Sequence, residues 1–486
     1  MKLSILHISD LHRNLEHEIT NDALLISLER DWLRYTEKEN PSIKSPDLII
    51  ASGDIIQGVR LGVSEPEKEL SKQYAQALEF LSRLSQKLLG GNKDKVIIVP
   101  GNHDVSSHHF YQSLRKLDIN RNDPKIKQLV RKLLNHNESV RWSWKDLDFY
   151  EIADKNIYNK RLESFCNFYR EFYDGRREFR LNPDEQFNIY DYPEFNIVVV
   201  GLSSCYNNDL YNRQGAINPK SLARATEKLT DFKYYNKIRI GVWHHNLAGT
   251  PMQNDYMDSS ILQNLIDCGF SLGFHGHQHK PQFIDERFKF GENKKITVIS
   301  AGTLCGGENS LPSGYSRSYN LVEIDTEILS GKLHLREMQD SNFNFPIWSS
   351  GLFKTTGKSL VDFSIQSPPK APSEEIQIQK RLDEGENYYR TGEYKHAIEI
   401  LSPLIGQNIL ARKFILECYF SLEDMKSIIS NFDPPQTTSE IIYLIQALWT
   451  EGKKQRLHEL LYEENIHKSC DPSVALIRDQ YLKRLK

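Results

Sequence analysis

Five short segments of this chain combine carboxylate, amide and imidazole side chains, the groups that bind metal ions in proteins. In chain order they are Asp10-Leu11-His12, Gly53-Asp54, Gly101-Asn102-His103-Asp104, His244-His245 and Gly276-His277-Gln278-His279, and Ala301-Gly302-Thr303 follows them. Most come directly after a short apolar run, which is typical of a buried strand. Hard and borderline ligands at strand ends are what a hydrolytic site with two metal ions requires. One such segment would mean little, but five in this order predict a metal centre.

The first two segments indicate how the ions would be shared. Asp10 and His12 are two residues apart, so along an extended backbone their side chains would point to the same side and could bind one ion. Asp54 is the natural bridging ligand, because a carboxylate has two oxygens and can contact two cations. Cations about 3.5–4 Å apart need such a bridge to relieve their mutual repulsion. We therefore expect Asp54 at the centre of the site.

The later segments add further ligands. Asn102 offers a neutral amide oxygen, although an asparagine after a glycine is also ordinary turn chemistry. His277 and His279 are again two residues apart, and they could face one ion each or share one. Two imidazoles around a single residue are uncommon without a metal ion.

Alternating strand and helix patterns must position these segments. In the first hundred residues the pattern predicts strands at Leu3–Ile8, Asp47–Ala51 and Lys95–Val99, and helices at Asn21–Asn40 and Glu69–Leu89. Beyond residue 190 it predicts helices at Pro219–Leu229 and Ser260–Cys268 and strands at Asn196–Val200, Lys237–Trp243, Lys295–Ser300 and Tyr319–Ile324, the last at a sheet edge. This order predicts an α/β layered architecture.

Residues 105–190 interrupt the alternation with a charged, aromatic segment, which we predict to be a helical insertion over the site. Its interleaved basic and aromatic side chains could hold a phosphate backbone and stack bases. The same residues could instead form a solvated helical face above an aromatic core. They include Arg115, Lys116, Arg121, Lys125, Lys127, Arg131, Lys132, Trp142, Trp144, Arg170, Arg176 and Arg177.

A change of composition separates a C-terminal region. The stretch 361–374 contains the Pro-rich run Ser367–Ser373, which predicts a linker after a catalytic domain at residues 1–360. Residues 375–486 have helical patterns throughout. The spacing of a tetratricopeptide repeat is matched by Gly385, Tyr388, Gly392, Tyr394, Ala397 and Leu401, and the later segments match it poorly. We predict a short all-α helical-repeat domain.

Bulk properties limit the class of protein. With 486 residues the chain exceeds the usual size of a single hydrophobic core. A formal net charge of −3 excludes a strongly basic nucleic-acid coat, although a local patch could still bind one. The 6 cysteines are widely spaced without a CxxC pair, which favours reduced thiols in a cytosol. The N-terminal segment has no signal-peptide pattern, and no apolar stretch approaches the ~20 residues of a membrane span. We expect a cytoplasmic protein.

The order D-x-H, G-D, G-N-H-D, H and G-H-x-H resembles that of the calcineurin-like metallophosphoesterases, over about residues 1–340. The resemblance implies a four-layer α/β/β/α sandwich with the site at the strand ends. It implies two divalent ions, one held by Asp10, His12, Asp54 and His279 and the other by Asp54, Asn102, His244 and His277. In this family the ligand directly follows the strand, which favours His244 over His245. His245 is then either close to the substrate or merely packed.

The resemblance also implies roles for the catalytic pair His103 and Asp104. The histidine of G-N-H-D would face the substrate as general acid for the leaving oxygen, or as an electrostatic clamp on the phosphoryl group. Asp104 would orient its ring and favour the protonated form.

The expected chemistry is hydrolysis of a phosphate ester by a hydroxide that two cations generate from water. Mixed oxygen and nitrogen ligands suit manganese, and also iron or zinc, better than calcium. We expect a phosphodiesterase acting on a nucleotide or nucleic acid. Two alternatives stay open: a phosphomonoesterase or protein phosphatase whose target the helical C-terminus brings, and an interaction or effector subunit of a bacterial conflict (antiphage) system. The helical region could bind a protein partner, and no membrane is implied.

Overall fold

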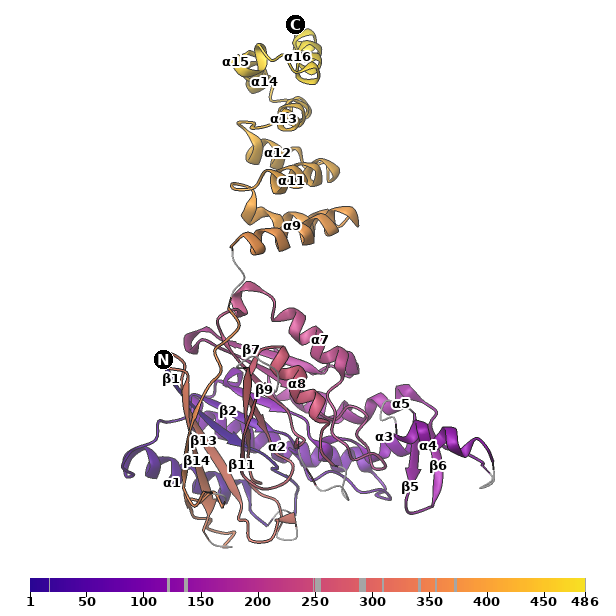
Figure 1. Cartoon of the computed structure of the whole chain (residues 1–486), viewed down its shortest axis with the longest axis vertical. Coiled ribbons are helices and arrows are strands. Elements are labelled where there is room, and N and C mark those ends of the chain that lie inside the picture. The colour runs from indigo at the N-terminus through magenta and orange to yellow at the C-terminus, as the bar shows by residue number, and fades with distance from the viewer. Residues whose placement is uncertain are drawn as a thin grey trace. The chain divides into compact units, whose positions relative to one another are not determined.

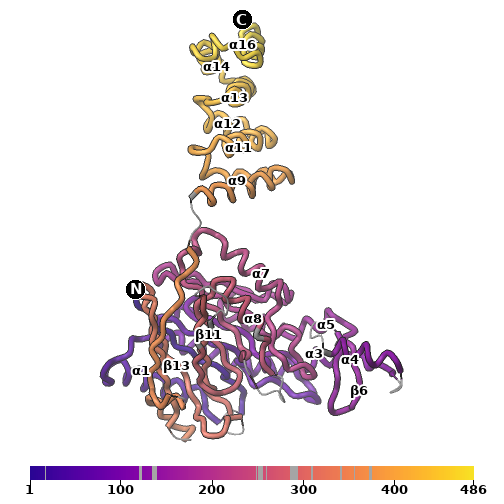
Figure 2. Tube along the Cα trace, viewed as in Figure 1, coloured from indigo at the N-terminus to yellow at the C-terminus, as the bar shows by residue number. Residues whose placement is uncertain are grey.

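The computed structural model describes residues 1–16, 18–119, 123–134, 139–247, 249, 255–287, 294–307, 310–339, 342–354, 356–370 and 374–485. They form two compact units, Met1–Lys370 and Ala371–Lys486 (Figures 1 and 2). None of the helices in the described residues is long and apolar enough to cross a membrane.

The first unit contains two large mixed sheets, and one of them includes the N-terminal strand. Its strand order is β15-β14-β13-β1-β2-β3, and β16 also pairs with β14. Its strands are β1 (Lys2–Ile8), β2 (Leu48–Ser52), β3 (Val96–Val99), β13 (Ser318–Asp325), β14 (Ser330–Met338), β15 (Trp348–Ser350) and β16 (Leu360–Ser364). The three strands that the sequence predicts near the N-terminus are present and run parallel. The prediction that Tyr319–Ile324 lies at a sheet edge is wrong, because β13 pairs with β1 on one side and β14 on the other.

The second large sheet has the order β11-β12-β10-β9-β8-β7. Its strands are β7 (Phe187–Tyr192), β8 (Ile197–Leu202), β9 (Ile238–Val242), β10 (Phe270–His275), β11 (Gln282–Arg287) and β12 (Lys295–Ser300). The central strands β8, β9, β10 and β12 are parallel, so their carboxyl ends meet at one edge of the sheet.

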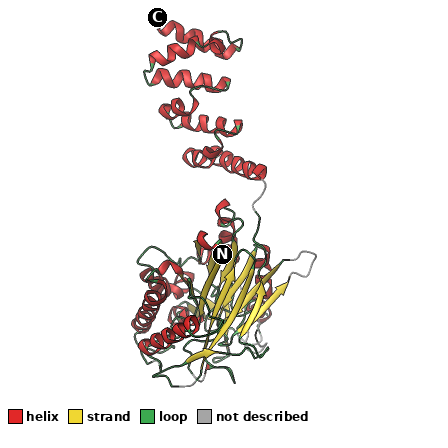
Figure 3. Cartoon of the chain, turned by 90° about the vertical axis from the view of Figure 1, so that its left-hand side faces the viewer, coloured by secondary structure: helices red, strands yellow, loops and turns green. Residues whose placement is uncertain are grey.

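Apolar side chains on both faces of these strands produce the layers. In β8, Ile197 and Val199 join a core that also includes the first sheet and helices α1 (Asn21–Glu37), α2 (Pro66–Leu89) and α6 (Glu163–Phe172). Val198 and Val200 join a second core with α7 (Pro219–Lys228) and α8 (Ser259–Asp267). Figure 3 shows the strands packed together with helices along their flank. The predicted four-layer α/β/β/α sandwich is confirmed.

The insertion at 105–190 differs from the helical segment that the sequence predicts. It begins with α3 (Ser107–Gln112) and contains a three-stranded antiparallel sheet in the order β4-β6-β5. Its further elements are β4 (Leu114–Lys116), α4 (Ile126–Leu134), β5 (Val140–Ser143), β6 (Asp148–Ile152) and α5 (Lys155–Asn159). Aromatic residues paired across strands stabilise such a sheet, as Trp142 and Phe149 do here. The last helix of the insertion, α6, belongs to the main core, where its aromatic face is buried.

The second unit is all-helical, as predicted. Its helices are α9 (Glu374–Arg390), α10 (Tyr394–Leu401), α11 (Ile409–Ser421), α12 (Met425–Phe432), α13 (Thr438–Thr450), α14 (Lys454–Tyr462), α15 (Glu464–His467) and α16 (Pro472–Leu485). Gly385 allows α9 and α10 to approach closely, because a Cβ there would overlap Leu401. Within the stretch predicted as a linker, residues 361–364 belong to β16 and pair with β14, whereas 371–373 lie outside the described residues.

Candidate metal centre

The predicted ligands lie just beyond strand ends, on a strained backbone. Positive φ angles occur at Asp10 (53°), His12 (44°), Asp54 (50°), His277 (78°) and His279 (54°). Left-handed backbone at a non-glycine residue costs about 1–3 kcal/mol and persists where the surroundings over-determine it, typically at functional sites. The prediction that Asp10 and His12 lie on an extended backbone is therefore wrong. Tight turns bring the two side chains together. Hydrogen bonds from Asp10 N to Gly53 O and from His12 N to Asp54 O hold these turns in place.

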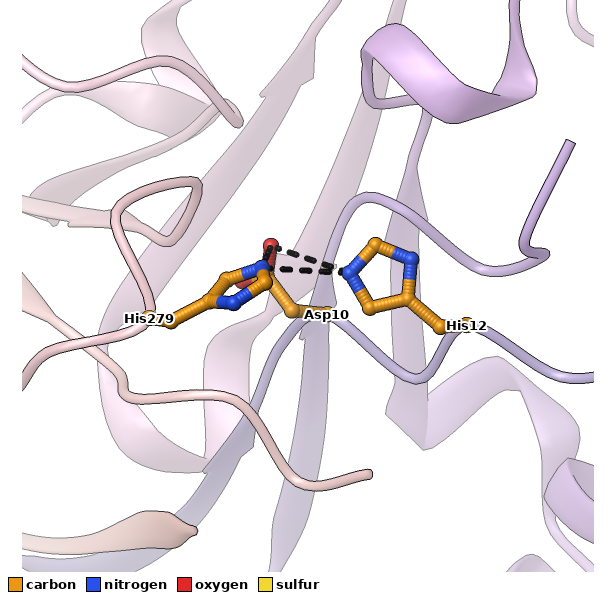
Figure 4. Close-up of side chains that lie close together, drawn as sticks. All are labelled: Asp10, His12 and His279. Carbon is orange, nitrogen blue, oxygen red and sulfur yellow. Dashed lines mark hydrogen bonds and ion pairs between the residues drawn. The ribbon is translucent and has the colours of Figure 1, made fainter. Parts of the chain in front are cut away.

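Asp10, His12 and His279 form the first group of converging ligand atoms (Figure 4). His279 Nε2 lies 3.2 Å from Asp10 Oδ1 and 3.1 Å from His12 Nε2, and His12 Nε2 lies 3.9 Å from Asp10 Oδ1. Asp10 Oδ1 is buried and has no partner with hydrogen-bond geometry among the described residues. Three lone pairs that meet at one point, including an unsatisfied carboxylate oxygen, fit a divalent cation.

Asp54, Asn102, His244 and His277 form the second group. His244 Nε2 lies 3.3 Å from Asp54 Oδ2 and 3.1 Å from Asn102 Oδ1, and Asn102 Oδ1 lies 2.9 Å from His277 Nδ1. Ligand atoms of His12 and Asp54 also lie within 4.8 Å of each other, so Asp54 adjoins both groups. Each group takes one histidine of the Gly276–His279 segment.

Partners outside the two groups orient the imidazoles. Nδ1 of His244 donates to Ser52 O at 2.8 Å, and Nδ1 of His279 donates to Ser310 O at 2.8 Å, which leaves both Nε2 lone pairs free to bind an ion. His277 is reversed: its Nδ1 faces the group, and its Nε2 lies 3.6 Å from Asp255 Oδ2. Sequence reasoning missed these partners, because backbone carbonyls carry no side-chain signal and Asp255 stands in a loop without a motif.

The electrostatics of the centre also fit cations. The side chains of Asp10 and Asp54 are 0% and 2% exposed, and their ion pairs within the described residues are with imidazoles. Burial alone would raise the pKa of Asp54, but the imidazoles, above all His244, hold it well below its usual range. Burial lowers the pKa of His244, but the carboxylate of Asp54 outweighs this and raises it to about 9. Without a metal ion the carboxylates thus favour the protonated forms of His244 and His279, whose pKa values are raised despite burial, and a bound cation would replace those protons.

Comparison with known proteins gives the family. The family model for calcineurin-like phosphoesterase matches residues 3–281. The chain belongs to this family. It is therefore a metal-dependent phosphoester hydrolase, and its substrate is a phosphate ester.

A curated relative and several solved structures resemble this phosphoesterase. The "uncharacterized metallophosphoesterase-like protein YydB" of Bacillus subtilis is 23% identical over 440 residues, which cover 89% of this chain and 75% of that protein. The phosphopantetheinyl hydrolase PptH of Mycobacterium tuberculosis is 15% identical, with a TM-score of 0.28, over 62% of this chain and 90% of that one. The calcineurin-like phosphoesterase YfkN of Bacillus subtilis is 11% identical, with a TM-score of 0.28, over 75% and 90%. Structural likeness at this level adds nothing to the family assignment.

His103 of this phosphoesterase lies at the rim of the centre, with a side chain that is 36% exposed. Its Nδ1 donates to Gln57 O at 2.6 Å, and its Nε2 lies 3.9 Å from Asp54 Oδ2. A carbonyl only accepts, so Nδ1 keeps its hydrogen and Nε2 is the atom that can gain or lose a proton. Ligand atoms of His103, His12 and Asp54 lie within 4.8 Å of one another, so His103 adjoins the metal centre.

Asp104 does not orient the ring of His103, which corrects the prediction. Its Oδ2 accepts from Gly101 N at 2.8 Å and Ile55 N at 3.2 Å, and its Oδ1 accepts from the Tyr74 hydroxyl at 3.0 Å. The single turn at Asn102–Asp104 directs this carboxyl back to the start of the turn. Burial raises the pKa of Asp104 to about 7. Asp104 thus fastens the loop that carries Asn102 to the loop that carries Asp54.

His245 is packed, which resolves the two alternatives that the sequence leaves open. Its Nδ1 lies 2.8 Å from Ser204 Oγ and its Nε2 lies 3.2 Å from Asn208 Nδ2. A Cβ at Gly215 would overlap its side chain. Burial holds the pKa of His245 well below its usual range, so the ring is neutral and supports its neighbours.

Small residues beside the ligands allow close approach. A Cβ at Gly101 would overlap Asp54 Oδ1, and one at Gly276 would lie 2.5 Å from Asp10 Oδ2. Thr303, in the Ala-Gly-Thr segment, donates from Oγ1 to Asp10 O at 2.8 Å. These residues shape the centre without taking part in the chemistry.

Proposed function

We propose that the chain is a phosphodiesterase acting on nucleotides or nucleic acid with two divalent ions, manganese in the first place and iron or zinc as substitutes. The proposal assigns one ion to Asp10, His12, Asp54 and His279, and the other to Asp54, Asn102, His244 and His277. Its main support is the meeting of two buried ligand groups at Asp54, which adjoins both. An arrangement in which one carboxylate adjoins two cation sites suits in-line displacement at phosphorus.

The residues have distinct tasks in this proposal. Bound ions would supply Lewis acidity toward the phosphoryl oxygens and acidify water. Asp54 spans the two ligand groups, and the second-group residue Asn102 adds an oxygen without adding charge. His103 presents Nε2 at the open rim, where it can donate a proton to the leaving oxygen or stabilise the charge on the phosphoryl group. Gln57 O fixes the ring in this orientation.

A comparison of model esters tests the proposal. With manganese, the intact chain should hydrolyse bis-p-nitrophenyl phosphate, and Asp54→Asn should not. Absence of turnover of this diester with manganese, iron or zinc by folded protein would refute the phosphodiesterase proposal. A clear preference for p-nitrophenyl phosphate would instead make the chain a phosphomonoesterase, and the helical unit would then be the natural carrier of target specificity.

A further inference from the structure

The sheet inside the insertion presents a tryptophan to solvent. We call the elements β4, α4, β5 and β6, in the described residues 114–119, 123–134 and 139–152, the hairpin lobe. Trp144 follows β5 at the turn into β6, and it is 82% exposed. Leu147, in the same turn, is also exposed. Tryptophan is enriched at interaction sites, because it offers a large apolar ring and a polar N–H.

Two further rings support this tryptophan. Trp142 meets Trp144 edge to face with ring centroids 5.9 Å apart, and Phe149, its partner across the strands, lies 4.7 Å from Trp142. The supporting rings restrict where Trp144 can move, yet its own surface stays open. The result is an anchored but accessible π-face.

The opposite side of the lobe is attached to the main body. Arg141 Nε donates to Asp209 Oδ2 at 2.8 Å, and Ile152 packs with Phe110 and Tyr158. Because successive side chains of a strand alternate between faces, the neighbour Trp142 points away from this attachment. Figure 1 shows β5 and β6 projecting from the rest of the first unit.

Helix α4, which contacts β5, carries a cluster of basic side chains. In the described stretch 123–134 the acidic residue is Asp123, whose Oδ1 accepts from Lys125 N at 2.8 Å. The exposed basic residues of this stretch are Lys125, Lys127, Arg131 and Lys132. None of these four forms an ion pair with a described residue. The basic residues of β4 differ, because Arg115 pairs with Glu151 at 2.9 Å and Lys116 with Asp148 at 2.6 Å. The cations of α4 are thus available to an external anion.

We infer that the hairpin lobe binds single-stranded nucleic acid, with a base stacked on Trp144 and phosphates contacted by α4. An aromatic platform beside cations is the usual way in which proteins bind single strands without sequence preference. A lipid surface fits less well, because it needs a broad exposed apolar helix face. Ile126, Leu129 and Leu133 are only partly exposed, and the exposed apolar residue described in α4 is Val130. The inference rests on the proposed function, in which the substrate carries phosphodiesters, and it selects a polynucleotide over a free nucleotide.

The test measures binding and hydrolysis separately. The probe is a fluorescein-labelled oligothymidylate of about 20 nucleotides, longer than the ~4–16 that one binding fold covers. Fluorescence anisotropy of the intact chain in EDTA gives the dissociation constant at several salt concentrations, without cleavage. Trp144→Ala should bind about tenfold more weakly. The triple variant Lys127→Gln, Arg131→Gln, Lys132→Gln should reduce the slope of log K against log salt by about 2.

Controls keep the outcomes separate. Phe345→Ala removes another exposed aromatic residue, and Lys68→Gln with Lys220→Gln and Lys233→Gln removes three exposed lysines elsewhere; both should bind as the wild type does. All variants should hydrolyse bis-p-nitrophenyl phosphate unchanged. Equal binding by wild type, Trp144→Ala and the α4 variant would overturn the inference, as would a preference for phosphatidylserine vesicles over the oligonucleotide. If binding depends on the lobe but no ester is hydrolysed, the proposed function fails instead.

Discussion

The metal centre and the hairpin lobe lie in the same compact unit but present their functional side chains in opposite ways. In the centre, Asp10 and Asp54 are buried, and a left-handed backbone holds each in one position. In the lobe, Trp144 and the basic residues of α4 stand in water. We propose that this chain separates bond breaking, at the metal centre, from substrate capture, at the hairpin lobe. The carboxylates of the centre are buried away from water, where electrostatic interactions are strong. The aromatic and basic side chains of the lobe are exposed, where a flexible polymer could bind.

The largest expected effect comes from the bridging carboxylate. Asp54→Asn should lower kcat for bis-p-nitrophenyl phosphate by at least about 10³-fold, because one amide oxygen cannot contact two ions. Binding of the oligonucleotide in EDTA should be unchanged. The matched control is Asp31→Asn, another buried carboxylate, which bonds to Arg336 and has no metal role. It should reduce stability and retain the metal content. If Asp54→Asn keeps activity within tenfold of the wild type, the bridging role is wrong.

A smaller loss is expected at the rim of the centre. His103→Ala should lower kcat by about 10²-fold, the usual contribution of a positioned proton donor. Its metal content, measured by elemental analysis, should equal that of the wild type, since His103 belongs to neither ion in the proposal. As a control, His334→Ala removes a histidine of β14 that is hydrogen-bonded to Glu323 of β13. Loss of an ion from His103→Ala would make this residue a ligand.

The metal-free protein should show a pH dependence that distinguishes the two regions. Because His244 has a pKa raised to about 9 beside Asp54, its pairing stabilises the fold fully below its unfolded pKa of about 6.5. This stability is lost as pH rises through about 9, and the free energy of unfolding should fall by at most about 3 kcal/mol. Thermal unfolding in EDTA between pH 6 and 10 measures it. Asp54→Asn should flatten the profile, whereas the α4 variant should follow the wild type. A wild-type profile that is flat over this window would contradict the coupling.

Loss of the carboxylate of Asp255, which lies beside His277, should have a smaller effect than the changes above. Asp255→Asn should weaken metal binding about tenfold, because Asp255 Oδ2 lies near the outer nitrogen of this ligand. Calorimetric titration with manganese measures the change. Asp258→Asn, three residues further, keeps an N-cap of α8 and should have no effect. Equal affinities for Asp255→Asn and the wild type would remove Asp255 from the support of the centre.

The smallest expected effect comes from the C-terminal unit. We propose that this unit binds a protein partner, so removal of residues 375–486 should leave hydrolysis of the model diester and oligonucleotide binding unchanged. The first unit has its own cores, which the truncation leaves intact. Loss of ester hydrolysis by a folded truncated protein would show that the helices belong to the catalytic machinery.

The sequence predicts much of the sandwich and of the candidate site, for a physical reason. The buried parallel strands are continuous apolar runs, so the sequence locates the strand ends that the ligand segments follow. The division of the ligands between two ions is what the family resemblance implies. The sequence nevertheless did not predict the left-handed turns that bring Asp10 and His12 together, because hydrogen bonds to the distant loop at Asp54 determine these turns. The orientation of Asp104 escaped for a similar reason, since its partners are backbone amides that no side-chain pattern marks.

The insertion was harder to predict. Trp142 and Phe149 read equally well as one side of a helix, and only their pairing across β5 and β6 defines a sheet. The strands are short, so period-two alternation has too few residues to dominate a helical pattern. The exposure of Trp144 was not predicted either, because the sequence does not distinguish this residue from the half-buried Trp142.

Anomalous scattering from crystals soaked in manganese tests the central claim most directly. The account predicts two peaks about 3.5–4 Å apart, with Asp54 between them, His12 and His279 on one, and His244 and His277 on the other. A pocket without peaks, or a single ion that does not touch Asp54, would contradict it.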